Sequence, residues 1–408
     1  MGVYSHTNCE FRFFFYLPSK SYPQIISVSS SPNNKRNTND SQLVWGFTLI
    51  EIVIVLGVVA GLLVVGFLSL GNLRGKQALD SVLQEITVAA RDTQKKSIAQ
   101  EEGARWNIRF SNDGAGDYRY EVFSGVAYSP SAVQKISRLR NSVRFTDPFA
   151  SSTRDVFFNP LTGRPLETKI ISLANRRSDG LVGDVIIKSL GSILPRLETG
   201  VLGYWHFDEN TSSTAYDASG MGNNGTLING PTWATASNCK SGSCLGFDTS
   251  FFQQVSISNS LGLGPKTALT LSAWIYPTGT GGSDVMSTVI QGLSLPAYYL
   301  SFNDSVNALS CYWYDTIPAG YHTTGNNSIS LNQWSHIACV WDGTNIKQYI
   351  NGMLANTVAV TGAGASPTLV VIGAETTARQ FQGIIDEVRI YNRALSAEEV
   401  KRQYYDLK

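Results

Sequence analysis

Charged residues are scarce in this chain of 408 residues, and neither sign of charge dominates. They make up 15% of the sequence, and 32 Lys and Arg against 31 Asp and Glu leave a formal net charge of +1. A nearly neutral chain offers no overall electrostatic attraction to nucleic acid or to an acidic partner, so we expect neither to bind. Aromatic residues are well represented, with 18 Tyr and 8 Trp, alongside many Gly, Ser, Thr and Asn. This composition is typical of extracellular proteins rich in β-strands.

The sequence also lacks the motifs of common hydrolases. Its four His residues form no HExxH zinc motif, and no GxSxG or Glu-x-Asp-x-Glu run occurs. Asp386 and Glu387 are adjacent on an expected strand, so their side chains should point to opposite faces and not share a cleft. The run GMGNNG at 220–225 matches a dinucleotide-binding pattern, but no buried strand precedes it and no helix follows it. We interpret it as a Gly/Asn turn and expect a protein that is not an enzyme.

A single long apolar run, from Phe47 to Leu70, lies near the N-terminus and contains one acid, Glu51. Its roughly 24 residues would form a helix of about 36 Å, enough to cross a bilayer core of about 30 Å. The stretch GFTLIEIVIVLGVVAGLL resembles the processing signal of type IV pilins and type II secretion pseudopilins. That resemblance implies cleavage after Gly46 by a prepilin peptidase, N-methylation of Phe47, and pairing of Glu51 with the methylated Phe47 of a neighbouring filament subunit. A signal anchor with a stray acid is the alternative.

Residues 1–46 would then be the prepilin leader, and residues 47–70 a transmembrane and filament-core helix. Lys35 and Arg36 precede the apolar run and favour a cytoplasmic N-terminus. We therefore expect a single-pass membrane protein with an extracytoplasmic C-terminus, which contacts inner-membrane lipid before assembly and reaches the cell surface in a pilus. The leader is longer than those of the family, which favours a true start codon downstream of Met1.

Residues 71–195 are predicted to complete a pilin-like module. Apolar residues recur at three- and four-residue spacing from Leu79 to Ala90, which predicts an amphipathic helix to about Gln100. Alternating segments that predict strands follow at 106–110, 118–123, 143–146, 155–158, 169–173 and 184–189. The stretches ARDTQKKSIAQEEGARWNIRF and FFNPLTGRP resemble minor pilins and pseudopilins of the GspH and FimT type. The implied fold class is α+β, a long N-terminal helix with an antiparallel sheet.

Residues 196–202 contain a glycine, follow Pro195 and precede a change in composition, so we interpret them as a linker. Residues 203–408 consist of short alternating segments between Gly, Asn and Pro turns, a pattern that predicts a β-sandwich. The stretches GYWHFDE, LTLSAWIYP, QWSHIACVWDG and FQGIIDEVRIYNRALSAEEV occur in the order of a laminin-G-like jelly roll of the concanavalin A-like lectin and glucanase superfamily. The resemblance implies an all-β jelly-roll sandwich after the pilin-like module.

Four of the five cysteines follow the apolar run, and an even number in an exported protein predicts two disulfides. Cys239 and Cys244 flank the short loop KSGS and are expected to pair. Cys311 and Cys339 lie on two predicted strands and can pair only if those strands are close. Buried free thiols are the alternative.

Aromatic residues near a loop rich in Pro, Gly and Thr are candidates for ligand binding. They are Trp313, Tyr314, Tyr321 and His322. Aromatic faces stack on sugar rings, although packing inside the domain is the alternative.

A structural Ca²⁺ is the one cofactor that the sequence leaves open. Asp217 and Asp386 lie in segments where similar jelly rolls hold Ca²⁺ between the first and last strands. The alternative is that these side chains stabilise turns.

These features predict a minor type IV pilin that assembles with other pilin subunits into a surface filament. Its jelly roll would face outward and bind a glycan or a surface protein, as in adhesion. One alternative is a pseudopilin of a type II secretion system whose jelly roll contacts a cargo protein. Another is a membrane-tethered carbohydrate-active protein, which would need two carboxylates in one cleft.

Overall fold

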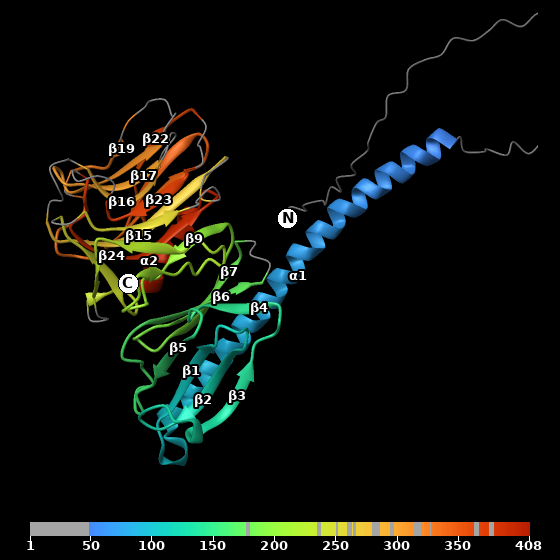
Figure 1. Cartoon of the computed structure of the whole chain (residues 1–408), viewed down its shortest axis with the longest axis vertical. Helices are drawn as coiled ribbons and strands as arrows, with labels where there is room; N and C mark the ends of the chain where they lie inside the picture. Colours follow the sequence, from blue (N-terminus) through green and yellow to red (C-terminus); the bar gives the residue numbers. More distant parts are fainter. Residues whose placement is uncertain are drawn as a thin grey trace, which may run out of the picture. The chain divides into compact units, whose positions relative to one another are not determined.

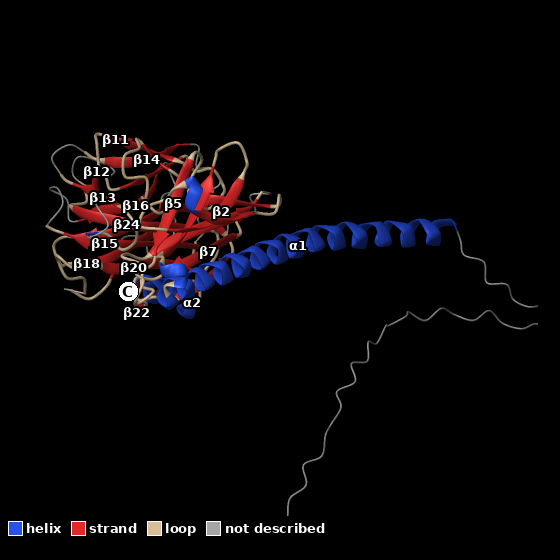
Figure 2. Cartoon of the chain, turned by 90° about the horizontal axis from the view of Figure 1, so that it is seen from below, coloured by secondary structure: helices blue, strands red, loops and turns tan. Residues whose placement is uncertain are grey.

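The computed structural model describes residues 49–408 except for 177–179, 235–237, 250–251, 259–262, 264–266, 280–285, 294–297, 314–319, 321, 327, 363–366 and 375–378. The chain divides into two compact units, Met1–Leu62 and Leu63–Lys408. Figure 1 shows the elements coloured along the sequence, and Figure 2 distinguishes helices from strands. The predicted leader and the predicted processing site at Gly46 and Phe47 lie outside the described residues.

The first element is α1, a helix of 51 residues from Leu49 to Ala99, drawn in blue at the start of the colour scale in Figure 1. The periodic apolar side chains between Leu79 and Ala90 are fully buried and enter the core of the strands that follow. The side chains from Leu49 to Val59 are exposed instead. The helical region ends in a short 3-10 turn, η1 (Glu101–Gly103), where Gln100 and Glu102 take left-handed backbone angles.

The predicted membrane topology is wrong. In the part of the chain that the structure describes, no helix is both long and apolar enough to cross a membrane. This finding overturns the expected single-pass membrane protein with a cytoplasmic N-terminus and an extracytoplasmic C-terminus.

Two four-stranded antiparallel sheets follow α1 and form what we call the first β-module. One sheet has the order β3-β2-β1-β5 and the other the order β4-β6-β7-β8. The strands are β1 (Trp106–Asn112), β2 (Tyr118–Ser124), β3 (Val133–Arg138), β4 (Val143–Asp147), β5 (Ser152–Phe157), β6 (Lys169–Asn175), β7 (Val182–Ile187) and β8 (Ile193–Glu198), with a 3-10 turn η2 (Pro130–Ala132) before β3. Apolar side chains of both sheets and of α1 share one core, which is why α1 stays attached to the strands.

The predicted linker at 196–202 is a pair of strands. Strand β8 ends at Glu198 and β9 (Val201–Trp205) begins at Val201, so only Thr199 and Gly200 connect them. Pro195 does not prevent strand formation because β8 is the last strand of its sheet, where a missing backbone N–H is tolerated. The proline and glycine that indicated a linker therefore mark an edge strand and a tight turn.

The rest of the chain forms two eight-stranded antiparallel sheets. The β17 sheet has the order β10-β11-β14-β23-β16-β17-β18-β19, and the β24 sheet has the order β12-β13-β24-β15-β20-β21-β22 with β9 also paired to β24. The strands are β10 (Thr214–Ala215), β11 (Gly225–Ile228), β12 (Thr232–Ala234), β13 (Cys244–Phe247), β14 (Gln254–Ser258), β15 (Leu269–Pro277), β16 (Met286–Leu293), β17 (Tyr298–Asn303), β18 (Ala308–Trp313), β19 (His322–Thr323), β20 (Ser335–Trp341), β21 (Asn345–Ile350), β22 (Met353–Ala359), β23 (Leu369–Ile372) and β24 (Gly383–Tyr391). Side chains of both sheets form one apolar core, as in a jelly-roll sandwich.

Helix α2 (Ala397–Leu407) closes the chain and begins at a capping box between Ser396 and Glu399. Its Leu407 packs with Trp274 of the sandwich and with Ile170 and Ile186 of the first β-module. The first β-module and the sandwich therefore share apolar contacts within one compact unit.

Candidate functional site

Two disulfides join the four cysteines of the sandwich: the expected pair of Cys239 and Cys244, and the pair of Cys311 and Cys339 that the sequence left open. Cys239 and Cys244 close the KSGS loop, with their Cα atoms 5.5 Å apart. Cys311 lies on β18 and Cys339 on β20, with their Cα atoms 6.0 Å apart. These two strands belong to opposite sheets, so the bond crosses the core instead of joining neighbours within one sheet.

Trp313 does not form part of an exposed ligand site. It is only 1% exposed and belongs to the core cluster between the two sheets. Residues of a strand alternate between its two faces, so Leu309, Cys311 and Trp313 of β18 all point into the core. His322 is half-buried on β19, where burial lowers the pKa of its imidazole. Its role stays a prediction, and Tyr314 and Tyr321 lie outside the described residues.

Asp217 and Asp386 each hold a loop through backbone N–H groups. The two carboxylate oxygens of Asp217 accept hydrogen bonds from Tyr204, Ser219 and Asn223 at 2.8–3.0 Å. Asp386 accepts from the backbone of Lys240 and Ser241, in the disulfide loop, at 2.9 and 3.3 Å.

The two aspartates do not fit the predicted calcium site. They serve different loops, and both oxygens of Asp217 are already engaged. Among the described residues, no group of three or more His, Cys, Asp or Glu side chains could hold a metal ion. The turn-stabilising alternative accounts for both oxygens of Asp217 and for one oxygen of Asp386, whose other oxygen has no hydrogen-bond partner in the described part of the chain.

Glu51 lies in the first turn of α1 with an exposed side chain. An acid in the first turn is favourable because the helix N-terminus carries partial positive charge. Its predicted partner, the amine of Phe47, lies outside the described residues.

Polar and aromatic side chains cover the face of the β17 sheet that points away from the core. Strand register places Gln291, Tyr299 and Tyr312 in one row across β16, β17 and β18. A second row consists of Thr288, Ser301, Ser310 and Thr323. The intervening Ile290, Leu300 and Cys311 enter the core, which fixes these two rows on the opposite face. We call the seven residues of the two rows the polar sheet face.

Three buried side chains of the polar sheet face have polar atoms without a hydrogen-bond partner among the described residues. They are the amide of Gln291, which is 0% exposed, and the hydroxyls of Thr288 and Ser301, which are each 1% exposed. Buried polar groups are usually paired, and each unpaired group costs roughly 1–3 kcal/mol. Such a cluster is closed to solvent, so its hydrogen-bonding capacity suits a buried water.

Aromatic rings border these polar groups. Tyr299 and Tyr312 are half-buried and meet edge to face, with ring centroids 5.2 Å apart. The guanidinium of Arg379 lies 5.9 Å from the Tyr299 ring centroid. Hydroxyl and amide groups beside an aromatic surface suit a ligand with an apolar ring face and a polar edge, such as a sugar.

Alternation along the sequence predicted strands at β17 and β18 but did not indicate this face. The predicted ligand residues lie near a loop, whereas the aromatic residues of this face alternate with core residues inside the strands. The period of two was visible in YYLSFN and ALSCYW. It did not reveal which of the two faces lies against the second sheet.

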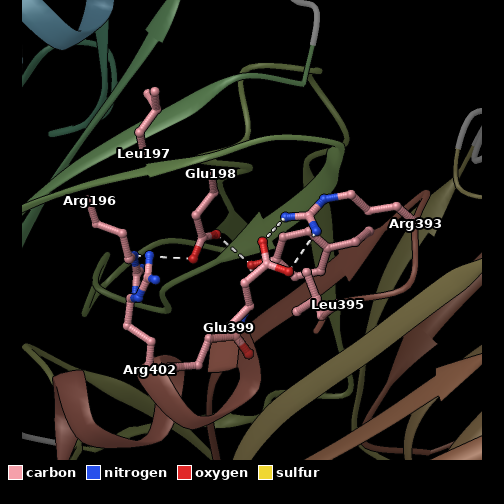
Figure 3. A pocket seen from close by; sticks show the side chains of 9 residues that line it. Arg196, Leu197, Glu198, Arg393, Leu395, Glu399 and Arg402 are labelled. Carbon is pink, nitrogen blue, oxygen red and sulfur yellow. Dashed lines mark hydrogen bonds and ion pairs between the residues drawn. The ribbon is translucent and has the colours of Figure 1, made fainter. Parts of the chain in front are cut away.

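Ionic side chains fill the junction between the first β-module and the sandwich. Figure 3 shows Arg196 beside Glu198 and Arg393 beside Glu399 around a small cavity. The cavity holds about 20 Å³, which is room for about one water molecule. Arg196 of β8 also pairs with Asp184 and with Asp406 of α2. These contacts join elements to one another and leave no space for a larger ligand.

The carboxylates of β24 belong to the same buried network and not to a cleft. Glu387 contacts His206 at 2.8 Å and Arg389 at 2.7 Å and accepts a hydrogen bond from Tyr204 at 2.6 Å. Asp386 and Glu387 are both 0% exposed. Neither is placed to act on a substrate.

Comparison with known proteins supports the assignment of the sandwich. The family model of the concanavalin A-like lectin/glucanases superfamily matches residues 248–401. No curated protein matches the chain. The residues matched by the family model exclude α1 and the first β-module, so this comparison does not support the predicted resemblance to pilins.

Several solved structures are similar at low identity. Domain 4 of AbnA, a GH43 extracellular arabinanase from Geobacillus stearothermophilus, in complex with arabinotriose, is 21% identical with a TM-score of 0.39, over 51% of this chain and 98% of that one. The binding domain of Paraclostridial Mosquitocidal Protein 1 is 17% identical with a TM-score of 0.42, over 50% of this chain and 52% of that one. The binding domain of botulinum neurotoxin serotype G is 18% identical with a TM-score of 0.39, over 50% of each chain.

This chain thus spans about half the length of the two toxin binding domains. The family match, together with two antiparallel sheets packed around one core, identifies the C-terminal part of the chain as a concanavalin A-like jelly-roll domain.

Proposed function

We propose that the jelly-roll domain binds a carbohydrate through the polar sheet face. The observation that carries this proposal is the pair of half-buried tyrosines, Tyr299 and Tyr312, which share a row with the buried amide of Gln291 and lie beside Arg379. A sugar hydroxyl both donates and accepts hydrogen bonds, so it suits an amide next to hydroxyl groups. The match to a family of lectins and glucanases supports a carbohydrate over other polar ligands.

Binding, and not hydrolysis, is the activity that we propose. Glycoside hydrolysis requires two carboxyl groups on either side of one bond. The seven residues that define the polar sheet face include no acid. Asp386 and Glu387 are buried elsewhere in loop and ion-pair contacts.

Tyrosine substitutions test this proposal on the full chain with a glycan array. Tyr299→Ala and Tyr312→Ala should each weaken binding of the glycans that the unsubstituted protein retains, by about tenfold for one lost aromatic contact. Tyr405→Ala is a matched control, because Tyr405 is 49% exposed on α2 and absent from the polar sheet face. Equal loss in all three variants, or no loss in the first two, would reject this face as the binding site.

The N-terminal part is proposed to make the protein a minor pilin subunit. The GFTLIEIV signal supports this role, and so does the start of α1, where large apolar side chains from Leu49 to Val59 are 44–83% exposed. A helix that is apolar all round requires burial, which copies of itself and other pilin subunits in a filament would supply. Processing at Gly46 and Phe47 by a prepilin peptidase, and a role for Glu51 in assembly, belong to the same proposal.

Sheared filaments provide the test. Glu51→Ala should reduce the amount of the protein recovered in sheared filaments while its total amount is unchanged. Glu102→Ala, a change of the same kind beyond the end of α1, is the control. Unchanged recovery of Glu51→Ala would count against the filament role. Recovery in a secretion complex and not in filaments would favour a pseudopilin whose jelly roll contacts cargo.

A further inference from the structure

A second cleft lies where the first β-module meets the loop that precedes β11. It has a volume of about 200 Å³, ten times that of the cavity in Figure 3. Its lining combines aromatic and polar side chains, among them Tyr118, Arg144, Thr146, Phe149, Tyr216 and Asn224. We call it the junction cleft. The GMGNNG motif, which the dinucleotide pattern did not explain, supplies Gly220, Gly222 and Asn224 to one wall.

Hydrogen bonds hold that wall in shape without a ligand. Asp217 receives three backbone N–H groups, as described above, and its own N–H donates to the side chain of Asn224 at 2.9 Å. The indole of Trp205 donates to the carbonyl of Asn223 at 2.9 Å. A wall that is already ordered loses little conformational entropy when a ligand binds.

The opposite wall is fixed to the loop by a direct contact. Arg144 of β4 donates to the carbonyl of Gly220 at 2.7 Å. Gly220 also approaches β6 closely, because a Cβ added there would lie 2.8 Å from the Cβ of Ala174. These contacts fix the distance between the two walls, so the cleft is preformed.

The chemistry of the lining suits a ring that has one apolar face. Phe149 and Tyr216 come from different walls and stack with ring centroids 4.5 Å apart and planes 8° apart, and both are half-buried. Thr146 contributes a buried hydroxyl that has no hydrogen-bond partner in the described part of the chain. Aromatic surface next to hydroxyl and amide groups again matches a sugar.

Arginine side chains at the cleft favour a sugar that carries negative charge. Arg144 lines the cleft, and Arg176 lies 5.3 Å from the ring centroid of Tyr118. The one carboxylate among the described lining residues is Asp217, which is buried and bonded to three N–H groups. The cleft therefore presents positive charge to a ligand, and a guanidinium forms paired hydrogen bonds with a carboxylate, an anionic group that sugars carry.

We propose that the junction cleft binds one acidic sugar residue, a uronate, of a polysaccharide. The cleft is separate from the polar sheet face, so this inference goes beyond the function proposed above, and either site can fail in a test without the other. A uronate would contact both the first β-module and the jelly roll at once.

Saturation-transfer NMR on the full chain tests the inference with methyl β-D-glucuronide and methyl β-D-glucoside as matched probes. The glucuronide should show saturation transfer and the glucoside at least tenfold weaker binding, because it lacks the carboxylate. Arg144→Gln should reduce glucuronide binding about tenfold, and Tyr216→Ala should reduce it to a similar degree. Tyr405→Ala, on α2 and outside both proposed sites, should leave it unchanged.

A third variant covers the case in which Arg144→Gln or Tyr216→Ala fails to fold. Ala150 lines the cleft and is exposed, so Ala150→Trp should fill the cleft without disturbing the core. Loss of glucuronide binding in this variant would support the site. Equal binding of the glucuronide and the glucoside would overturn the proposed preference for an acidic sugar. Undiminished glucuronide binding by Ala150→Trp, or no binding of either probe by the unsubstituted chain, would overturn the site.

Discussion

The buried pair of His206 and Glu387 should make the stability of this protein depend on pH between about 6.5 and 9. The Nδ1 atom of His206 lies 2.8 Å from a Glu387 oxygen, and its Nε2 atom lies 2.8 Å from the hydroxyl of Ser172 in the first β-module. Burial by itself lowers the pKa of His206. The carboxylates of Glu387, Asp147 and Asp208 outweigh burial and raise that pKa from 6.5 to about 9.

The size and sign of the effect follow from this change in pKa. A rise from 6.5 to about 9 corresponds to about 3 kcal/mol of folding free energy, at 1.36 kcal/mol per pH unit. Because folding raises the pKa, the stabilisation is complete below pH 6.5 and is lost as the pH rises through about 9. Burial raises the pKa of Glu387, but His206 and Arg389 lower it to about 2. The raised pKa of His206 and the lowered pKa of Glu387 arise from the same attraction, so its free energy is counted once.

Urea unfolding of the full chain at pH 6, 7.5 and 9 measures this effect. His206 alone should reduce the unfolding free energy of the unsubstituted protein by about 3 kcal/mol across the range, and Glu209 adds a further loss in the same direction. Glu387→Gln keeps the shape of the side chain and removes its charge, so its loss across the same range should be much smaller. Glu387→Gln should also be less stable at pH 6 by roughly 3–5 kcal/mol, because Arg389 loses its buried partner.

A second destabilised variant separates the pH effect from general weakness. Ile337→Val removes one buried methyl group from the core of the sandwich and leaves the His206–Glu387 pair intact. It should keep the full decline from pH 6 to 9. Glu209, whose pKa burial raises to about 7, titrates in all three proteins and cancels from the comparison. Equal declines in all three proteins would refute the assignment of the effect to His206 and Glu387.

Three further outcomes are expected from the same unfolding assay and from calorimetry. Replacing Cys311 and Cys339 by alanine should lower the free energy of unfolding by roughly 3.5 kcal/mol, and replacing Cys239 and Cys244 should lower it by roughly 2 kcal/mol. The first effect is larger because that bond closes a longer loop. A larger loss from the Cys239 and Cys244 variant would contradict this explanation. Trp313→Ala should cost about 3–5 kcal/mol, whereas Tyr312→Ala on the opposite face of β18 should cost much less. Metal-stripped protein titrated with Ca²⁺ should release no binding heat, and saturable heat abolished by Asp217→Asn would restore the predicted calcium site.

Local sequence patterns predicted the helix and most strands but not the segment that joins the two β-domains. Local period identified the buried face of α1 from Leu79 to Ala90, because helix packing repeats every three to four residues. Turn residues and alternation placed most strands of the sandwich for the same local reason. The linker prediction failed because composition cannot distinguish an edge strand that contains a proline from an irregular segment.

Long-range contacts decided the site residues. Trp313 and Tyr312 are neighbours in the sequence, but the second sheet buries Trp313 and leaves Tyr312 on the polar sheet face. Asp217 lies in a segment typical of a calcium site, yet the loop folds back so that three N–H groups occupy its carboxylate. Spacing in the sequence alone cannot assign Asp217 as a calcium ligand, because backbone N–H groups compete with the metal ion for its oxygens.

The sequence by itself determined the order of the parts: a helix that starts apolar and becomes amphipathic, strands after it, and a jelly-roll domain with two disulfides. These features depend on residue type and on periods of a few residues. The tertiary structure alone decided that residues 196–202 join two strands, that Cys311 and Cys339 meet across the core, and that the first β-module and the jelly roll enclose a cleft. Each of these depends on which faces pack together over long sequence separations, and no local pattern encodes that choice.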